Sequence, residues 1–421
     1  MGTLKLRNDY TSPRWSGEIL DCSMPMTFDT YSVCAYDCLY CFSFFQKSHC
    51  VNGYLEKEAR SVNVERVQKM FDLILSNNYD ALGKAGREFY HYVNNRKVMQ
   101  WGALADQFDP FEKKYGVTLE LLRYFDYIDY PLSFSTKATW WTEDYRYMDI
   151  FKKHTHNWHV KISIITNDEK KSKMIERGVP SPERRFQALK NLSSIGIHTT
   201  LRLRPFIYSL SDDYKVLIDK AKEAGVDGVT SEFLCLETRA DKRLKSRYEK
   251  MSYILGYDIY NLYRKKSNAF GYLRFDPAYK RNKFKEMRDY AHSLGLRFNS
   301  SDASGRDFND SCNCCGVPPE WNSQTSHFGG AVLIAREKGE VRYSDIEKDL
   351  KKLFGHFVMK SAEGFNTINN RNRAIYYDST MEDWIRSKWN SKSAVAPDKM
   401  YGCLVRAGID EDGNVIYRYK F

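Results

Sequence analysis

Apolar segments of strand length alternate with amphipathic segments of helix length over the first 234 residues. The strand-like segments are rich in β-branched and aromatic residues and span residues 24–33, 97–105, 132–137, 158–166, 197–205 and 226–234. Apolar positions at helical spacing predict helices at residues 62–75, 118–128, 143–153, 181–195 and 211–224. This alternation predicts an α/β fold with a mainly parallel sheet, as either an open barrel or a doubly wound sheet.

Residues at the segment ends support these helices. Asn63 and Thr118 are suited to cap helix starts, and a Ser-Pro-Glu run opens the helix at residue 181. Gly196 and Gly225 follow the last apolar positions of two helices, where glycine commonly ends a helix.

The pattern changes after residue 234, which predicts three parts: 1–234, 235–300 and 301–421. Residues 235–300 read as a helical, basic and aromatic insertion closing the barrel, with one more strand at 296–300. Residues 301–319 are rich in Ser, Asp, Gly and Cys and are expected to form a linker. The rest predicts a small α+β region, with a helix at 344–353 and a hairpin of 404–409 and 415–421 around Asp412-Gly413.

Composition indicates a globular protein. Hydrophobic residues make up 42% and charged residues 28% of the 421 residues. The apolar runs are far shorter than the roughly 18 residues of a membrane span, and the N-terminus lacks the apolar core of a signal peptide. We therefore expect a cytoplasmic protein with no membrane association. The ten cysteines are clustered, which favours reduced thiols that bind metal over a disulfide framework.

Positive charge is concentrated in one stretch. The chain carries a net charge of +11, and residues 239–288 hold 15 Lys/Arg against five Asp/Glu. Nearly the whole excess therefore lies within residues 239–288, which argues for an anionic partner such as a nucleic acid or nucleotide.

Cys34, Cys38 and Cys41 lie within eight residues, directly after the first strand. Three thiolates on such a loop can bind one iron–sulfur cluster and leave one iron open for a ligand. A structural zinc site would normally have four protein ligands. Unligated buried cysteines or part of a zinc knuckle are the alternatives.

The Cys-x3-Cys-x2-Cys spacing, with Tyr40 before the third cysteine, resembles the signature of the radical S-adenosylmethionine (SAM) superfamily. The resemblance implies a partial (β/α)6 barrel and a 4Fe-4S cluster whose open iron chelates SAM. Reductive cleavage of SAM then yields a 5′-deoxyadenosyl radical that abstracts hydrogen from the substrate. It also implies a reducing electron donor such as flavodoxin or ferredoxin.

Residues 25–234 further resemble the spore photoproduct lyase and DNA repair photolyase-like branch. The similar segments are residues 102–112, the Thr-Lys ending at Lys137, residues 176–182 with Arg184-Arg185, and residues 202–205. The chain departs from the branch at Arg177-Gly178, where a proline is usual, and it lacks the Gly-Gly-Glu form of the SAM-amine motif.

By position, the resemblance places Tyr40 near the adenine of SAM and the backbone of Trp101 and Gly102 near the methionine amine. Ser163 and either Arg202 or Arg204 become candidates for the ribose hydroxyls and the carboxylate. An arginine fork suits a carboxylate, although a salt bridge on a barrel strand is the alternative for each arginine.

The resemblance and the basic stretch together favour repair or modification of a nucleic acid base or nucleoside. The alternative is a radical SAM enzyme that modifies a peptide or small metabolite. A non-catalytic iron–sulfur or zinc module is a third interpretation, and the SAM-pocket segments argue against it.

Four further cysteines could have either a functional or a packing role. Cys312, Cys314 and Cys315 could hold an auxiliary cluster or zinc, or could be packed, redox-prone thiols. Cys235 follows the last barrel strand, at the end where such barrels open. Its thiol could be the catalytic hydrogen-atom donor to a substrate radical, as in the lyase branch, or simply a small buried side chain.

Two last clusters have structural explanations. His154, His156 and His159 lie where a helix gives way to a strand, so their rings are not expected to share a face and no metal site is predicted. Tyr253, Tyr257, Tyr260 and Tyr263 fall at helical spacing. Packing is their default role, although nearby cations make a nucleic acid surface the alternative.

Overall fold

An eight-stranded sheet forms the centre of the molecule. The computed structural model describes residues 6–44, 59–238, 240, 242–266, 272–323, 326–354 and 380–421. Seven strands run parallel, in the order β3 (Met26–Phe28), β6 (Met99–Trp101), β7 (Leu132–Thr136), β8 (Trp158–Ser163), β10 (His198–Phe206), β11 (Gly228–Phe233) and β14 (Arg297–Ser300). An eighth strand, β2 (Arg14–Trp15), pairs antiparallel with β3 at one edge.

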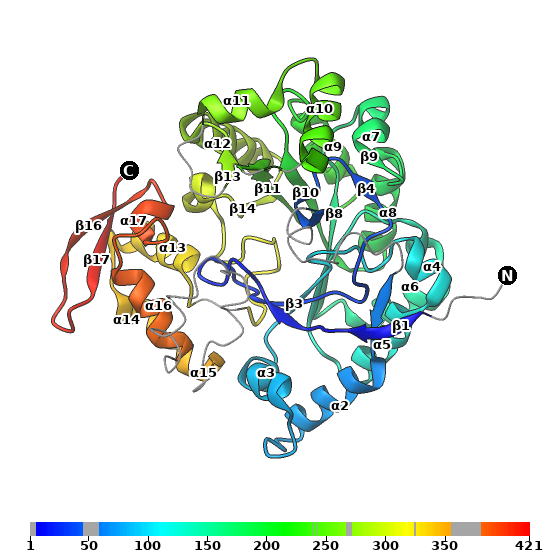
Figure 1. Cartoon of the computed structure of the whole chain (residues 1–421), viewed down its shortest axis with the longest axis horizontal. Coiled ribbons are helices and arrows are strands. Elements are labelled where there is room, and N and C mark those ends of the chain that lie inside the picture. Colours follow the sequence, from blue (N-terminus) through cyan, green and yellow to red (C-terminus); the bar gives the residue numbers. More distant parts are fainter. Residues whose placement is uncertain are drawn as a thin grey trace.

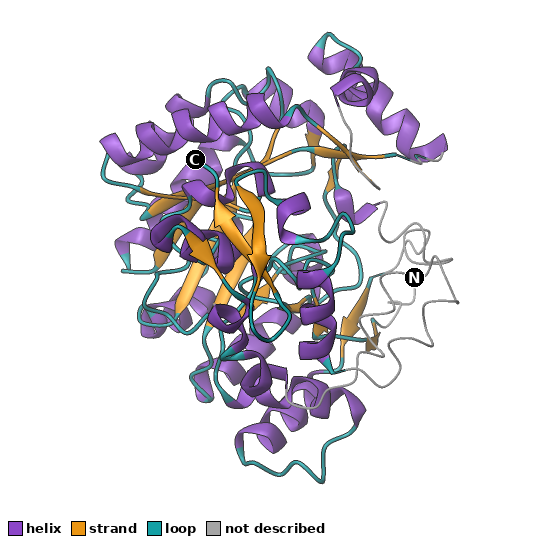
Figure 2. Ribbon diagram, turned by 90° about the vertical axis from the view of Figure 1, so that its left-hand side faces the viewer, coloured by secondary structure: helices purple, strands orange, loops and turns teal. Residues whose placement is uncertain are grey.

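The strand order decides between the two predicted architectures. The seven parallel strands follow one another across the sheet in the same order as along the chain. Each crossover therefore moves in one direction, whereas the order reverses in a doubly wound sheet. Figure 2 shows the strands surrounded by helices. The α/β fold is thus an open, partial barrel, and all seven strands expected from the sequence are present.

Five of the barrel helices match the predicted segments, whereas the helices at residues 84–94, 110–115 and 169–175 were not predicted. The barrel helices are α2 (Val64–Leu75), α3 (Lys84–Asn94), α4 (Pro110–Tyr115), α5 (Val117–Tyr127), α6 (Tyr145–Phe151), α7 (Glu169–Ile175), α8 (Pro182–Ser194) and α9 (Tyr214–Glu223), with 3-10 turns η1 (Trp140–Glu143) and η2 (Lys152–His154). Asn63 caps α2 by accepting from the Arg66 amide at 2.9 Å. The predicted Thr118 cap is wrong: Thr118 lies inside α5, where its hydroxyl donates to the Gln107 carbonyl at 2.8 Å.

Residues 235–300 form the expected helical insertion around a short hairpin. It consists of β12 (Cys235–Glu237), α10 (Lys242–Leu255), α11 (Ile259–Lys266), β13 (Tyr272–Arg274) and α12 (Pro277–Ser293), which leads into β14. Strands β12 and β13 pair antiparallel. Two small sheets lie outside the barrel: β1 (Arg7–Tyr10) with β5 (Arg60–Val62), and β4 (Asp37–Cys38) with β9 (Glu176–Arg177).

The C-terminal part is α+β, as predicted. After η3 (Ala303–Phe308) it contains α13 (Phe328–Lys338), β15 (Glu340–Val341), α14 (Tyr343–Glu347), α15 (Leu350–Phe354), α16 (Met381–Asn390), α17 (Pro397–Met400), β16 (Leu404–Ile409) and β17 (Val415–Tyr419). The predicted helix at 344–353 is two short helices, whereas the hairpin turns at Gly413 (φ +80°) as expected. Figure 1 shows α13, α14, α16 and this hairpin on one side, opposite α7 and α8. Apolar packing is continuous from Trp15 to Tyr417, and the predicted three-part division stays a prediction.

In the part of the chain that the structure describes, no helix is both long enough and apolar enough to cross a membrane.

A buried histidine makes the stability of the C-terminal part depend on pH. His327 is 1% exposed, and its Nδ1 accepts from the Gly330 amide at 3.1 Å to cap α13. Burial, and then Arg306, lowers the pKa of His327 from 6.5 to about 3. The unfolded chain therefore gains a proton that the folded chain rejects, so stability is lost as the pH falls below 6.5.

We expect His327→Asn, which keeps a capping oxygen, to remove this part of the pH dependence. Between pH 7 and pH 5 the wild type should lose about 2 kcal/mol more stability than the variant. Urea titrations of both proteins at the two pH values measure the difference. Parallel losses in the two proteins would contradict the prediction.

Candidate active site

The cysteine loop lies at the carboxyl edge of the sheet, directly after β3. Cys38 is 6% exposed, and Cys34 and Cys41 are half-buried. All three thiols are free of disulfides. Strand β4 holds the middle of the loop by pairing Cys38 with Glu176 of β9. Because the strands are parallel, their carboxyl ends bring residues 102–106, Lys137, Ser163 and Cys235 to this same edge.

The segment after β6 anchors the cysteine loop. Asp29 accepts the backbone amides of Ala103, Leu104 and Ala105 at 2.8–3.0 Å and fixes the turn after β6. Asp109 caps α4 and also accepts the amide of Ala35 at 2.5 Å, next to Cys34. The segment that resembles the lyase branch therefore acts here as a scaffold for the cysteine loop.

The other two acids of this segment are also structural. Glu112 is 1% exposed and accepts the hydroxyls of Tyr31 and Tyr147 at 2.6 and 2.7 Å. Asp106 accepts the Thr136 hydroxyl at 2.8 Å and the Lys137 amide at 2.6 Å, which fixes the end of β7. Glu112 also accepts the amides of Thr118 and Leu119 at 2.7 and 2.9 Å, so both carboxylates hold backbone in place.

A buried polar chain joins the loop to β8. The Tyr40 hydroxyl donates to Glu176, which forms an ion pair with Arg185 at 2.7 Å; both charged side chains are fully buried. Arg185 also donates to the Ser163 carbonyl at 2.7 Å. Burial favours the neutral acid, but Arg185 and Lys137 outweigh it and keep the pKa of Glu176 below its ordinary value. Tyr40 and Ser163, both predicted cofactor residues, are thus linked through a charged pair.

Arg247 of α10 holds the loop from the other side. Its guanidinium forms an ion pair with Asp37 at 2.7 Å and donates to the carbonyls of Cys38 and Leu39. It also lies 4.4 Å from the ring centroid of Phe44. This role could not be predicted from the sequence, because Arg247 is separated from Asp37 by 210 positions and lies among many other cations.

Two of the loop thiols, Cys34 and Cys38, lie where the protein alone would keep them protonated. Burial, and then Lys137 and Glu176 with opposing effects, shifts the pKa of Cys38 to about 12. Burial and Asp109 raise the pKa of Cys34 well above its usual value. A bound metal deprotonates its thiol ligands, so loading of this site releases protons.

Gly102 marks a close approach of the backbone to two neighbouring residues. Its φ is +86°, and a Cβ there would lie 2.5 Å from the Ser135 carbonyl and still closer to the Gln107 side chain. Both polar atoms of the buried Gln107 amide lack a hydrogen-bond partner in the described part of the chain. An amide with two unused groups can both donate to and accept from a bound ligand. Gln107 was missed, although it falls inside the segment that carries the resemblance.

The Trp101 side chain is part of the barrel core. Its ring is fully buried, stacks on Phe134 at 5.5 Å and donates to the Thr30 hydroxyl at 3.1 Å. The side chain thus belongs to the core, and the expected place of the Trp101 backbone near the methionine amine stays a prediction.

The structure distinguishes the two candidate arginines. Arg204 forms an ion pair with Glu232 of β11 at 2.5 Å, and that acid raises the pKa of Arg204 against the effect of burial. The backbone of Arg202 is paired within the sheet, whereas its guanidinium has no hydrogen-bond or ion-pair partner among the described residues. Burial, and then Arg204, lowers the pKa of Arg202 to about 10. An arginine that lacks an anion and lies beside a second arginine is the better candidate for a carboxylate ligand.

Cys235 opens β12, immediately after the end of β11. Burial, and then Glu232, raises the pKa of Cys235 to about 12, so the group is a thiol at neutral pH. A hydrogen-atom donor needs the S–H bond, and this environment preserves it.

The loop that contains Cys312, Cys314 and Cys315 packs against strand β10 of the barrel. A Cβ at Gly316 would lie 2.8 Å from the Thr200 hydroxyl, so the loop closely approaches β10. A hydrogen bond with Cys314 lowers the pKa of Cys315 to about 6, and Cys22 interacts with both thiols. Among the described residues, these thiols are not part of a group of three ligand atoms within 4.8 Å. The auxiliary metal is therefore not supported.

Much of the basic stretch is neutralised within the fold. On α12, Lys280 pairs with Asp302 at 2.7 Å and Arg281 with Asp307 at 2.6 Å. The α12 cations Lys283, Lys285 and Arg288 also have acidic partners. Exposed cations without a partner in the described part of the chain lie instead on α10 and α11: Lys242, Lys245, Lys250, Arg264 and Lys265. Residues 239, 241 and 267–271 lie outside the described residues.

Three of the four tyrosines at helical spacing have packing roles. Tyr263 is fully buried, and the hydroxyls of Tyr257 and Tyr260 donate to the carbonyls of Tyr208 and Thr238. Only Tyr253, 84% exposed on α10, is available to a partner.

No protein-family model and no curated protein matches the chain. Several solved structures are similar to it. A variant of spore photoproduct lyase superposes with a TM-score of 0.50 at 14% identity, over 70% of this chain and 80% of the lyase. A second lyase variant, with bound AdoMet and dinucleoside spore photoproduct, gives 0.47 at 15% identity over 67% and 78%. Streptococcus suis SuiB bound to S-adenosylmethionine gives 0.40 at 14% identity over 66% and 51%. The chain therefore has the fold of spore photoproduct lyase, as the resemblance to this branch of the radical SAM superfamily led us to expect.

Proposed function

We propose that this protein is a radical SAM enzyme whose 4Fe-4S cluster is bound by Cys34, Cys38 and Cys41. The observation that carries the proposal is the position of the three thiols, on a loop fixed at the carboxyl edge of a partial barrel by Asp109, Arg247 and the β4–β9 pair. When bound, the cluster supplies the electron that cleaves SAM to a 5′-deoxyadenosyl radical. The proposal includes a reducing cytoplasmic compartment and a flavodoxin- or ferredoxin-type electron donor.

The surrounding residues have distinct parts in this proposal. The backbone at Gly102 and the Gln107 amide bind the methionine amine, and Arg202 binds the carboxylate. Tyr40, held by Glu176, lies beside the adenine, and Ser163 is a candidate for a ribose hydroxyl. Arg204 positions Glu232 rather than binding SAM. Cys235 returns a hydrogen atom to the substrate radical, which its protonated thiol permits.

For the substrate, we favour a nucleic acid base or nucleoside, in a repair or modification reaction. Support comes from the fold shared with spore photoproduct lyase and from the exposed cations of α10 and α11 that lack a partner in the described part of the chain. Tyr253 adds an exposed ring among these cations, as nucleic acid surfaces often do.

A peptide or small metabolite is the second candidate substrate. The ion pairs of α12 favour this class of substrate. They neutralise several cations of residues 239–288, so fewer positive charges are free to bind an anionic substrate than the sequence alone predicts.

The proposed chemistry is tested with anaerobic protein reconstituted with iron and sulfide and reduced with dithionite. It should bind SAM and convert it to 5′-deoxyadenosine. Protein that carries about four irons per chain and neither binds nor cleaves SAM would overturn the proposal.

A salt titration separates the two substrate classes. If the cations of α10 and α11 contact four to five phosphates of duplex DNA, log K should fall with log salt with a slope of about −4. Lys245→Glu and Lys250→Glu should each weaken binding and reduce the slope by about one. Fluorescence anisotropy of labelled duplex measures both quantities.

Lys285→Glu is the matched control, because this exposed α12 lysine already pairs with Asp289 at 2.9 Å. It should change binding less than the α10 variants. No binding at low salt would favour the peptide or metabolite substrate.

A further inference from the structure

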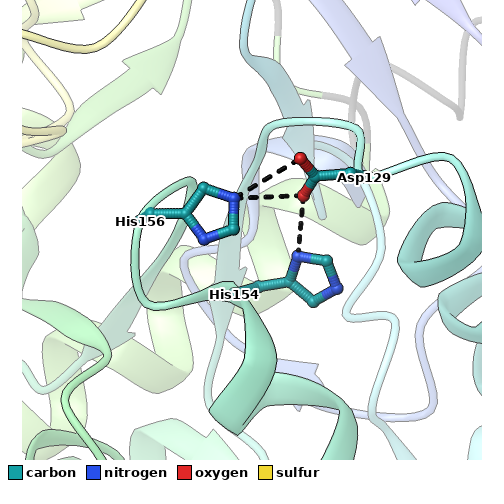
Figure 3. A group of neighbouring side chains, drawn as sticks. All are labelled: Asp129, His154 and His156. Atoms are coloured by element: carbon teal, nitrogen blue, oxygen red, sulfur yellow. Dashed lines mark hydrogen bonds and ion pairs between the residues drawn. The ribbon is translucent and has the colours of Figure 1, made fainter.

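Two histidines and an aspartate converge at the amino edge of the sheet, opposite the cysteine loop. Asp129 lies in the turn between α5 and β7, and His154 and His156 precede β8 (Figure 3). One ligand atom from each residue lies within 4.8 Å of the other two. The expectation that the histidine rings would not share a face is therefore wrong for this pair, because the η2 turn brings them together. His159 lies apart, buried on β8.

The distances match the edges of a tetrahedral metal site. His154 Nδ1 lies 3.2 Å and His156 Nε2 lies 3.1 Å from the same carboxylate oxygen of Asp129. Tetrahedral zinc, with ligand bonds of about 2.0–2.1 Å, puts its ligand atoms roughly 3.3 Å apart. Both nitrogens thus lie at about a tetrahedral edge length from the carboxylate oxygen, and all three ligand atoms lie within 4.8 Å of one another.

Both ring nitrogens of His154 face acceptor oxygens, which requires a proton or a metal ion at each nitrogen. Its Nε2 lies 2.9 Å from Asp126 Oδ1 and must donate to that carboxylate. Its Nδ1 then faces two further acceptors, Asp129 Oδ1 and Asn157 Oδ1, each at 3.2 Å. A neutral imidazole has one N–H, so Nδ1 turns a lone pair toward two oxygens. Either a second proton or a metal ion must lie there.

Asn157 cannot relieve this conflict by turning its amide around. Its Nδ2 donates to the carbonyl and the carboxylate of Asp129, at 3.2 and 2.7 Å. Those contacts keep Asn157 Oδ1 toward His154.

A carboxylate holds the far side of the His154 ring, as is common for histidines that bind metal. Asp126 holds the nitrogen opposite Nδ1, and Lys153 binds Asp126 at 2.9 Å. The ring is 3% exposed and stacks on Trp158 at 4.1 Å with an interplanar angle of 12°. A carboxylate behind a ligating histidine fixes its tautomer and strengthens metal binding. The exposed His156 and Asp129 leave an approach for the ion and for water.

We propose that Asp129, His154 Nδ1 and His156 Nε2 bind one Zn²⁺ ion, with water completing its coordination. Two imidazoles and one carboxylate suit zinc better than magnesium or calcium, which prefer oxygen ligands alone. The ion would join the turn after α5 to the turn before β8 and so stabilise the barrel at the edge away from the cluster. This site is independent of the proposed radical chemistry.

The test is a Zn²⁺ titration of the full chain with its iron–sulfur site loaded, so that the cluster cysteines are occupied. Competition with a chromophoric chelator gives the affinity and the stoichiometry. We expect one Zn²⁺ per chain, bound at least tenfold more weakly by His156→Ala and Asp129→Asn. Asp126→Asn, which alters only the support behind His154, should weaken binding about 10–100-fold. Zinc should also raise the melting temperature of the wild type and not that of His156→Ala.

His292→Ala is the matched control, because this half-exposed histidine pairs with an aspartate, Asp310 at 2.8 Å, outside any such group. It should bind zinc like the wild type. Equal affinity in the wild type and in His156→Ala would overturn the proposal. So would zinc binding that is lost in Cys315→Ser and kept in His156→Ala, because thiols would then bind the ion. Circular dichroism confirms that each variant is folded.

Discussion

Replacing Cys38 with alanine should reduce 5′-deoxyadenosine formation to the level seen without protein. Cys38 is the most deeply buried of the three loop cysteines, and its neighbours Asp37 and Leu39 are both tied down by hydrogen bonds. Loss of one of the three thiolates removes a cluster ligand. An enzyme accelerates its reaction at least about 10⁶-fold, so the loss is far larger than assay error.

Iron content is the second readout, since the variant should retain well under one cluster per chain. Cys403→Ala is the matched control: this thiol is 2% exposed and burial raises its pKa to about 12, as for Cys38, but it lies next to β16. The control should cleave SAM like the wild type. Deoxyadenosine made by Cys38→Ala at the wild-type rate would show that the cluster is bound elsewhere.

Arg185→Ala should cost about 3–5 kcal/mol of stability, because it leaves Glu176 charged and buried without its partner. The pair is fully buried, and Arg185 also holds the Ser163 carbonyl. Glu176 lies opposite Cys38 in the β4–β9 pair and accepts from Tyr40. The damage should therefore reach the cysteine loop and lower the iron retained after reconstitution.

The adjacent Arg184 provides a control of the same residue type. It pairs with Glu143 at 3.0 Å on the surface, where the two side chains are 56% and 48% exposed. Such a pair contributes at most about 1 kcal/mol, so Arg184→Ala should unfold close to the wild type in urea. Coincident urea transitions of the two variants would contradict the expected role of the buried pair.

The way in which the loop is held explains why both effects should be large. Its anchors come from four places in the chain: Asp109 after β6, Glu176 of β9, Arg185 of α8 and Arg247 of α10. Each anchor uses a charged group that is wholly or largely buried, so removal of one leaves an unpaired charge or an unmet backbone group. The site is therefore rigid because several distant segments meet there.

The sequence by itself determined the barrel strands and the position of the three cysteines. Alternating strand and helix patterns depend on local spacing, and the motif lies within eight residues, so both can be recognised without knowledge of the fold. Helix ends were less certain: Thr118 looked like a cap but lies within α5, since Gly116 has the positive φ (+71°) at which α4 ends.

Only the tertiary structure decided the contacts between distant segments. It showed that Arg204 is paired and Arg202 is not, that the cations of α12 meet the acids of residues 302–310, and that Arg247 binds the cysteine loop. It also brought Asp129 to His154 and His156, across a helix and a strand. Charge counts and spacing report what a segment carries, whereas an ion pair or a metal site depends on which segments the fold brings within about 4 Å.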